Sequence, residues 1–209
     1  MERRGLFITF EGGEGVGKST QIARLAARLE RLGYEVLVLR EPGSTPIGEK
    51  IRSILLDSAN GEMAPAAELL LYEAARAQII EQVVKPAIDA GKAVLCDRFT
   101  DSTMAYQGYA RGLGIEVVEA ANRLACGGFV PDRTLLLERD QARALADARG
   151  MGGDRIEMEP DAFHDEVRKA FRQIAEREPN RIRTVWVTDD IDVTEERVFE
   201  QVKDLVDGR

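Results

Sequence analysis

Residues 12–19, with the sequence GGEGVGKS, constrain the fold more than any other part of the chain. They follow a short run of β-forming residues at 6–10. They precede an amphipathic stretch that starts at Ser19 and ends at Gly33. A glycine-rich loop between a strand and a helix fits the pattern GxxxxGK[ST], whose backbone N–H groups and helix N-terminus bind phosphate. The sequence therefore predicts a strand–loop–helix unit that binds the phosphates of a nucleotide.

Two side chains of this loop have their own predicted roles. The amino group of Lys18 can reach the β- and γ-phosphates of ATP, and the hydroxyl of Ser19 can ligate Mg²⁺. A plain glycine-rich turn is the alternative interpretation, and the strand–helix context argues against it. The predicted ATP-binding residues are Gly12, Gly13, Glu14, Gly15, Val16, Gly17, Lys18, Ser19 and Thr20.

The rest of the chain alternates short apolar runs with longer helical patterns. Four further strands are predicted at residues 35–39, 93–96, 134–137 and 184–187. Helices are predicted from 47 to 56, from 66 to 84 with an end near Pro86, and from a capped start at Asp192. Short strands separated by helices are typical of parallel βαβ crossovers. We expect an α/β fold, a doubly wound five-stranded parallel sheet with helices on both faces.

Composition and organisation exclude several classes of protein. The 209 residues contain no internal repeat and no low-complexity linker, which favours a single domain over 1–209. A net charge of −8 argues against a nucleic-acid polymer as partner. No membrane span or secretory leader is predicted. Cys96 and Cys126 do not form a CxxC pattern, so we expect neither a disulfide framework nor a zinc site, and a cytoplasmic location.

Asp97 and Arg98 directly follow the predicted strand at 93–96. Ligands of open α/β sheets bind at the carboxyl edge of the sheet, where this pair would lie. The carboxylate of Asp97 is therefore a second candidate ligand for Mg²⁺, and the guanidinium of Arg98 suits bidentate binding of a phosphate. An ordinary strand-end or helix-capping role is the alternative for Asp97.

Besides the loop, several further motifs follow in order along nearly the whole chain. They are REPGST at 40–45, GExIR at 48–52, Tyr72 with Arg76, Asp97-Arg98-Phe99, Ser102 with Ala105-Tyr106-Gln107, Pro131-Asp132, and Asp154-Arg155-Ile156-Glu157. With these motifs, the sequence resembles the bacterial thymidylate kinases. The resemblance implies a fold of the P-loop NTPase type with a small LID at about 138–157. It also implies transfer of the γ-phosphoryl group of ATP to dTMP, giving ADP and dTDP, by a homodimer.

The resemblance assigns the residues that bind dTMP. Tyr72 would stack on thymine and Arg76 would donate to its O4, which favours thymine over cytosine because the cytosine amino group cannot accept. Tyr106 would crowd the 2′ side of the sugar and favour deoxyribose. The other implied contacts are Thr103 at the N3 edge of the base, Ser102 and Gln107 in the same pocket, and Arg52 and Arg98 at the phosphate. Taken singly, the tyrosines could be core residues and the arginines solvated charges.

The implied catalytic residues are Lys18, Arg98, Arg149, Arg155 and Glu14. Glu14 resembles the acid that approaches the acceptor sugar and the metal. No basic residue occupies positions 13–16, so a catalytic arginine must come from the LID, where Arg149 and Arg155 match the family better than Arg143. The chain shows no obvious general base, and His164 reads as a solvated residue. A phosphate nucleophile, whose second pKa is about 6, needs no base.

Two other functions remain open at this stage. A kinase for another pyrimidine monophosphate, such as dUMP, CMP or UMP, would share the phosphate loop and the LID. A nucleotide switch is the second alternative, although the chain contains no [NT]KxD guanine-recognition segment. The loop at 188–190 is the candidate contact for adenine.

Overall fold

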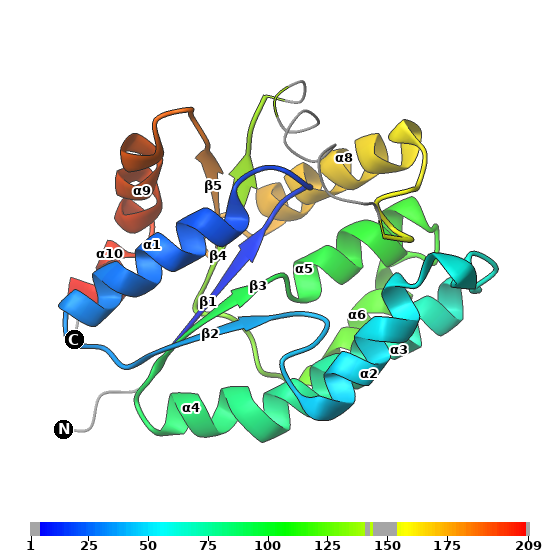
Figure 1. Cartoon of the computed structure of the whole chain (residues 1–209), viewed down its shortest axis with the longest axis horizontal. Helices are drawn as coiled ribbons and strands as arrows, with labels where there is room; N and C mark the ends of the chain where they lie inside the picture. The colour runs from blue at the N-terminus through cyan, green and yellow to red at the C-terminus, as the bar shows by residue number, and fades with distance from the viewer. Residues whose placement is uncertain (1–4, 141–142, 144–153, 208–209) are drawn as a thin grey trace.

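The computed structural model describes residues 5–140, 143 and 154–207 (Figure 1). Its five strands form one parallel sheet in the order β2-β3-β1-β4-β5. The strands are β1 (Leu6–Glu11), β2 (Val36–Arg40), β3 (Ala93–Asp97), β4 (Arg133–Glu138) and β5 (Ile182–Trp186). Each lies within two residues of the predicted strand, which confirms the predicted α/β class.

Helices cover both faces of this sheet (Figure 1). Helices α1, α9 and α10 pack on one face, and α3, α4, α6 and α8 pack on the other. The described helices are α1 (Lys18–Arg31), α2 (Pro46–Leu56), α3 (Pro65–Ile79), α4 (Lys85–Asp89), α5 (Thr100–Thr103), α6 (Ile115–Cys126), α8 (Asp161–Arg177), α9 (Ile191–Glu200) and α10 (Lys203–Asp207). Two π-helical turns, Ile80–Val84 and Met104–Ala110, and one 3₁₀ turn, Ser58–Asn60, complete them. Among the described residues, no helix has the length and apolar character that a membrane span requires.

Strand β1 lies in the middle of the sheet, and its side chains alternate between the two faces. Phe10 belongs to the cluster under α1 and α9. Phe7 faces the other way and meets Phe99 edge to face, with ring centroids 5.0 Å apart. Two polar residues share the face of Phe7, because Thr9 and Glu11 follow it at the strand period of two. The face that α3 and α6 cover therefore carries buried polar groups on the strand that leads into the loop.

Two predicted helix boundaries are wrong. The helix expected to end near Pro86 instead continues through a π-helical turn into α4, where Pro86 occupies the first turn. A proline inside a continuous helix removes one backbone hydrogen bond to the preceding turn, and the π-helical turn Ile80–Val84 lies at that place. The last predicted helix starts earlier than expected: Asp190, not Asp192, is its N-cap and accepts from the amides of Asp192 (3.0 Å) and Val193 (3.1 Å).

Candidate active site

A cavity of about 800 Å³ opens at the carboxyl edge of the sheet and extends from the glycine-rich loop to α3 and α5. Among the residues that line it are most of those named from the sequence. These are Glu14, Gly15, Val16, Gly17, Lys18, Ser19, Thr20, Arg52, Tyr72, Arg76, Asp97, Arg98, Ser102, Thr103, Tyr106 and Gln107. Segments that are far apart in the sequence thus converge on one cavity because all five parallel strands end at the same edge.

The glycine-rich loop wraps around the amino group of Lys18. Its Nζ donates to the backbone carbonyls of Gly12 (3.2 Å) and Gly13 (2.8 Å). Burial and the neighbouring Arg98 lower the pKa of Lys18 below its ordinary value. Gly12 has a φ of 133°, and a Cβ there would lie 2.4 Å from the carbonyl oxygen of Leu137. Only glycine fits this position, where β1 ends beside β4 and the loop begins.

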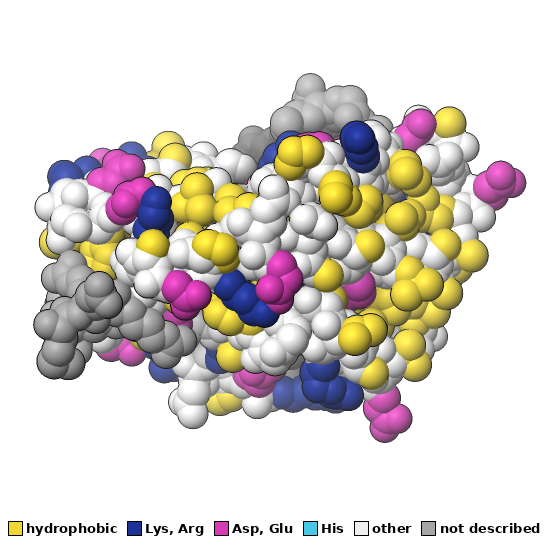
Figure 2. All heavy atoms as spheres, turned by 90° about the horizontal axis from the view of Figure 1, so that it is seen from below, with side chains coloured by type: hydrophobic (Ala, Val, Ile, Leu, Met, Phe, Trp, Pro, Cys, Tyr) yellow, Lys and Arg dark blue, Asp and Glu magenta, His cyan; other side chains and the backbone are white. Residues whose placement is uncertain are grey.

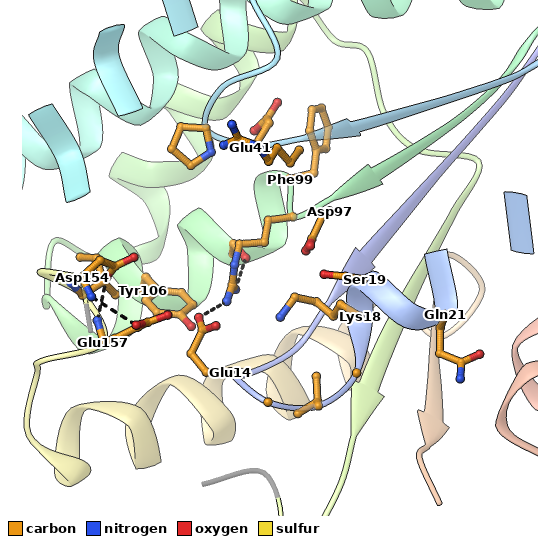
Figure 3. Close-up of a pocket in the computed structure, with 18 of the residues that line it drawn as sticks. Glu14, Lys18, Ser19, Gln21, Glu41, Asp97, Phe99, Tyr106, Asp154 and Glu157 are labelled. Carbon is orange, nitrogen blue, oxygen red and sulfur yellow. Dashed lines mark hydrogen bonds and ion pairs between the residues drawn. The ribbon is translucent and has the colours of Figure 1, made fainter. Parts of the chain in front are cut away.

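Ser19, Lys18 and Asp97 point into the same part of the cavity (Figure 3). The Oδ1 atom of Asp97 is buried and has no hydrogen-bond partner within the part of the chain that the structure describes. A single carboxylate beside a hydroxyl suits Mg²⁺, which keeps several waters and takes substrate phosphates as its other ligands. Among the described residues, no group of three or more histidine, cysteine, aspartate or glutamate side chains could hold a metal ion.

Arg98 is held from several sides at the centre of the cavity. It forms an ion pair with Glu14, and its Nη1 donates to Ser102 Oγ (3.1 Å) and to the carbonyl of Gly12 (3.2 Å). Its guanidinium carbon lies 5.3 Å from the ring centroid of Tyr106. The Arg98 charge holds the pKa of Glu14 below its usual range, so Glu14 is a carboxylate at neutral pH. Arg98 therefore lies between the glycine-rich loop and the residues expected to bind the acceptor.

Arg76 lies in the wall of the cavity with 1% of its surface exposed. Its Nε donates to Glu41 (2.8 Å), and its Nη1 donates to Glu73 (2.9 Å) and Asn122 (2.8 Å). Burial raises the pKa of Glu41 to about 7, against the opposing effect of Arg76. The orientation of the guanidinium is thus fixed by three partners, and a ligand edge would meet an arginine that has already been positioned.

The remaining expected dTMP contacts surround Arg98 and Arg76. Tyr106 is buried, and its ring packs against Phe163 (centroids 6.1 Å apart) and Phe171 (6.2 Å). Gln107 donates to Glu68 Oε1 (2.7 Å), so it supports the pocket wall. Arg52 donates to the carbonyl of Pro42 (3.0 Å), while Tyr72 and Thr103 line the cavity.

Arg155 lies elsewhere than expected. The sequence predicted a catalytic arginine, but this side chain is 6% exposed and is not among the residues that line the cavity. Its Nη2 donates to Glu68 Oε2 (2.5 Å) and its Nε to the carbonyl of Leu55 (2.8 Å). Because Glu68 is fully buried and needs a cationic partner, Arg155 binds it rather than the cavity. These contacts give Arg155 a structural role, and its catalytic role stays a prediction from the resemblance.

Some residues that line the cavity were not predicted from the sequence, and one predicted residue lies outside the described part of the chain. Arg139 lines the cavity and donates to the carbonyl of Gly15 (3.4 Å) and to Asp189 (3.2 Å). It directly follows β4 and lies two residues beyond the predicted strand at 134–137, and this position is the signal that could have found it. Asp154 and Glu157 also line the cavity (Figure 3). Arg149 lies outside the described residues.

Glu11 was also not predicted from the sequence as a site residue. It is fully buried at the end of β1, directly before the glycine-rich loop. Burial, together with the charge of Asp101, raises its pKa to about 8. A carboxylate between an apolar strand and a glycine-rich loop is the signal that could have drawn attention to it.

The parallel sheet with β1 at its centre, the glycine-rich loop after β1 and the acid after β3 define a P-loop nucleotide-binding protein. The thymidylate kinase family profile matches residues 10–198. The chain belongs to the thymidylate kinase family.

Named relatives agree over nearly the full length. The chain is 50% identical over 200 residues to a thymidylate kinase of Syntrophotalea carbinolica, covering 92% of this chain and 93% of that one. It is 50% identical over 190 residues to a thymidylate kinase of Trichlorobacter lovleyi, covering 88% and 90%. The crystal structure of the thymidylate kinase from Ehrlichia chaffeensis superposes with a TM-score of 0.78 at 31% identity, covering 95% and 98%.

Proposed function

We propose that this chain transfers the γ-phosphoryl group of ATP to dTMP, giving ADP and dTDP. The observation that carries the proposal is that one cavity joins the glycine-rich loop to the Tyr72 and Arg76 pocket, with Arg98 between them. Such an arrangement suits two anionic nucleotides whose reacting phosphates meet in the middle. Membership of the thymidylate kinase family supports the same reaction.

Positioning and charge account for the proposed chemistry. The loop amides and Lys18 bind the β- and γ-phosphates of ATP, while Arg98 and Arg52 hold the phosphate of dTMP against the γ-phosphoryl group. The attacking oxygen is already deprotonated at neutral pH, so no general base is needed. Mg²⁺ held by Ser19 and Asp97 would neutralise charge on the ATP phosphates. Glu14, ion-paired with Arg98, keeps that guanidinium directed toward the acceptor.

Selection of thymine and deoxyribose is assigned to four side chains. Arg76 donates to O4 of thymine. The orientation of its guanidinium is fixed by hydrogen bonds to Glu41, Glu73 and Asn122. Tyr72 stacks on the base and Thr103 contacts its N3 edge. Tyr106 excludes a 2′-hydroxyl, a role that its packing against Phe163 and Phe171 supports because the ring has little freedom to move. Arg149 remains the proposed LID arginine at the transferring phosphoryl group.

We also propose that the chain forms a homodimer through α2, α3 and α6. These helices are neighbours, and together they expose large apolar side chains, visible as a concentration of hydrophobic atoms in Figure 2. The exposed residues are Ile47, Ile54, Leu70, Val117 and Leu124. An apolar surface of this kind marks an interface, and a second copy presents a matching surface. We further propose that residues 1–209 form a single domain, with a LID at about 138–157. The proposed location is the cytoplasm, where ATP is available.

The proposed reaction is tested by coupling ADP release to NADH oxidation with each monophosphate in turn. We expect turnover with dTMP to exceed turnover with dUMP, CMP and UMP. Comparable rates with CMP or UMP would contradict the assigned role of Arg76. ADP release at the same rate without any acceptor would favour a nucleotide switch instead.

A further inference from the structure

Glu11 receives three hydrogen bonds from one short segment of the chain. Its Oε1 accepts from the amide of Phe99 (2.8 Å) and from the amide of Ser102 (3.2 Å). Its Oε2 accepts from Ser102 Oγ (2.5 Å). All three donors belong to the segment directly after β3, which carries Arg98. A fully buried carboxyl group thus binds the segment that presents the phosphate-binding arginine.

That segment contains a backbone conformation that needs support. Arg98 has a φ of 68°, in the left-handed region that residues other than glycine avoid. Its own amide donates to the carbonyl of Phe10 (2.9 Å), and the next amide, that of Phe99, donates to Glu11. Two consecutive residues of β1 therefore hold both sides of the strained residue. Strain of this kind persists only where the surroundings over-determine it.

The side chain of Arg98 is tied to the same carboxylate. The hydroxyl of Ser102 accepts from Arg98 Nη1 (3.1 Å) and donates to Glu11. Hydrogen bonds that are joined in a chain polarise one another, so these two bonds strengthen each other. Glu11 thereby acts on Arg98 twice, through the backbone and through Ser102.

We propose that Glu11 is a positioning residue for the acceptor phosphate, which it locates by fixing the Arg98 guanidinium. This inference rests on the proposed function, in which Arg98 binds the phosphate of dTMP. Glu11 itself does not touch the substrate. Its loss should weaken the use of dTMP more than the binding of ATP, because among the described residues its hydrogen bonds go to Phe99 and Ser102 and not to Lys18 or the loop amides.

The primary test is Glu11→Gln, which keeps the volume but directs an amide NH₂ group at one of the three donors. We expect the KM for dTMP to rise roughly tenfold, the scale of leaving one buried hydrogen-bond donor without a partner. The KM for ATP should stay within about twofold. Ser102→Ala, which removes only the linking hydroxyl, should shift the KM for dTMP in the same direction, and Ser102→Thr should restore it.

Thr9→Val provides the matched control. Thr9 lies on the same face of β1, is fully buried and pairs its hydroxyl with Thr134 (2.7 Å), but it does not line the cavity. We expect its kinetic constants to match those of the unchanged chain. A rise in the KM for dTMP as large as that of Glu11→Gln would overturn the inference, since any disturbance of β1 would then have the same effect.

The outcomes separate this inference from the proposed function. An unchanged chain that does not phosphorylate dTMP would overturn the proposed function and this inference together. An active unchanged chain with an unaltered KM for dTMP in Glu11→Gln would overturn the inference alone. If Glu11→Gln does not fold, the Ser102 variants decide. Equal KM values for dTMP in Ser102→Ala and Ser102→Thr would then overturn the inference about Glu11. Combined Glu11→Gln and Ser102→Ala changes should be less than additive, because both break one chain of bonds.

Discussion

Arg98 shows how one residue depends on its surroundings in both backbone and side chain. Its left-handed φ points the side chain back from the end of β3 toward the glycine-rich loop, where Glu14 and the Gly12 carbonyl receive it. The sequence predicted that Arg98 would face a phosphate, because the residue follows a strand. It could not predict the strained backbone, since φ here is set by contacts from β1.

We expect Arg98→Ala to lower kcat/KM for dTMP by about a thousandfold, because the acceptor phosphate loses its main cation. The KM for ATP should change little, since Lys18 and the loop amides remain in place. Steady-state kinetics with each substrate varied in turn would measure both values. Near-normal kinetics with dTMP in a variant of unchanged circular dichroism would remove Arg98 from the acceptor site.

Glu41 makes folding stability depend on pH. Burial raises its pKa to about 7 in the folded state, compared with about 4.3 in an unfolded chain. The folded state therefore binds more protons between these values. This contribution to stability is fully present below about pH 4 and is lost as the pH rises through 7. We expect Glu41→Gln to flatten this fall in the free energy of unfolding, measured by urea denaturation at several pH values. Glu49→Gln, at an exposed carboxylate, is the control, and an equal flattening there would contradict the prediction.

At the scale of elements, the segment at 154–157 is fastened to α2 and α3. Arg155 binds Glu68 on α3 and the Leu55 carbonyl on α2, and Ile156 joins the cluster beneath α8. The resemblance to a family could suggest that this arginine acts in catalysis. The resemblance could not reveal that Arg155 pairs with the fully buried Glu68 on α3, because these two residues are far apart in the sequence.

We therefore expect Arg155→Ala to destabilise the fold by about 2–3 kcal/mol, since Glu68 loses one charged partner but keeps Arg111 and Gln107. The kcat at a temperature where the variant remains folded should change less than twofold. Arg172→Ala, which breaks an exposed pair with Glu138, should cost less than about 0.5 kcal/mol. A large fall in kcat with unaltered stability would instead support the catalytic role that the resemblance predicts for Arg155.

The strands could be predicted well because each is a short, mostly apolar run between turns. The helix boundaries near Pro86 and Asp192 were less accurate. A π-helical turn and an N-cap depend on single hydrogen bonds that periodicity does not report. Element type follows from which residues are apolar, whereas the ends of elements follow from individual polar contacts.

At the scale of the whole molecule, the exposed faces of α2, α3 and α6 lead to a prediction about assembly. Leu124 is 87% exposed and Leu70 is 66% exposed. We expect Leu124→Arg and Leu70→Glu each to convert a dimer into a folded monomer, measured by light scattering after gel filtration. Val38→Lys changes a side chain that is 51% exposed on β2, away from these helices, and should leave the mass unchanged. A dimer of unaltered stability in both helix variants would place the interface elsewhere.

The site as a whole was only partly visible in the sequence. Lys18, Asp97 and Arg98 follow from strand–loop positions, and Tyr72 and Tyr106 follow from the resemblance. Glu11 and Arg139 were missed, because a buried acid and a strand-end arginine gain meaning only when distant segments are brought together. The net charge of −8 likewise gave no indication of a cavity lined by several arginines, because net charge does not report how charges are distributed in space.

The central position of β1 in the sheet affects how the chain folds during its synthesis. It is the first strand to be synthesised, yet its neighbours are β3, where Phe7 pairs with Val94, and β4, where Thr9 pairs with Thr134. A nascent chain must therefore carry an apolar strand with both edges unpaired through much of translation. Long-range pairing of this kind folds slowly and exposes the chain to aggregation. We therefore expect aggregation to lower the yield of this protein mainly in the interval between the synthesis of β1 and the synthesis of its partners β3 and β4.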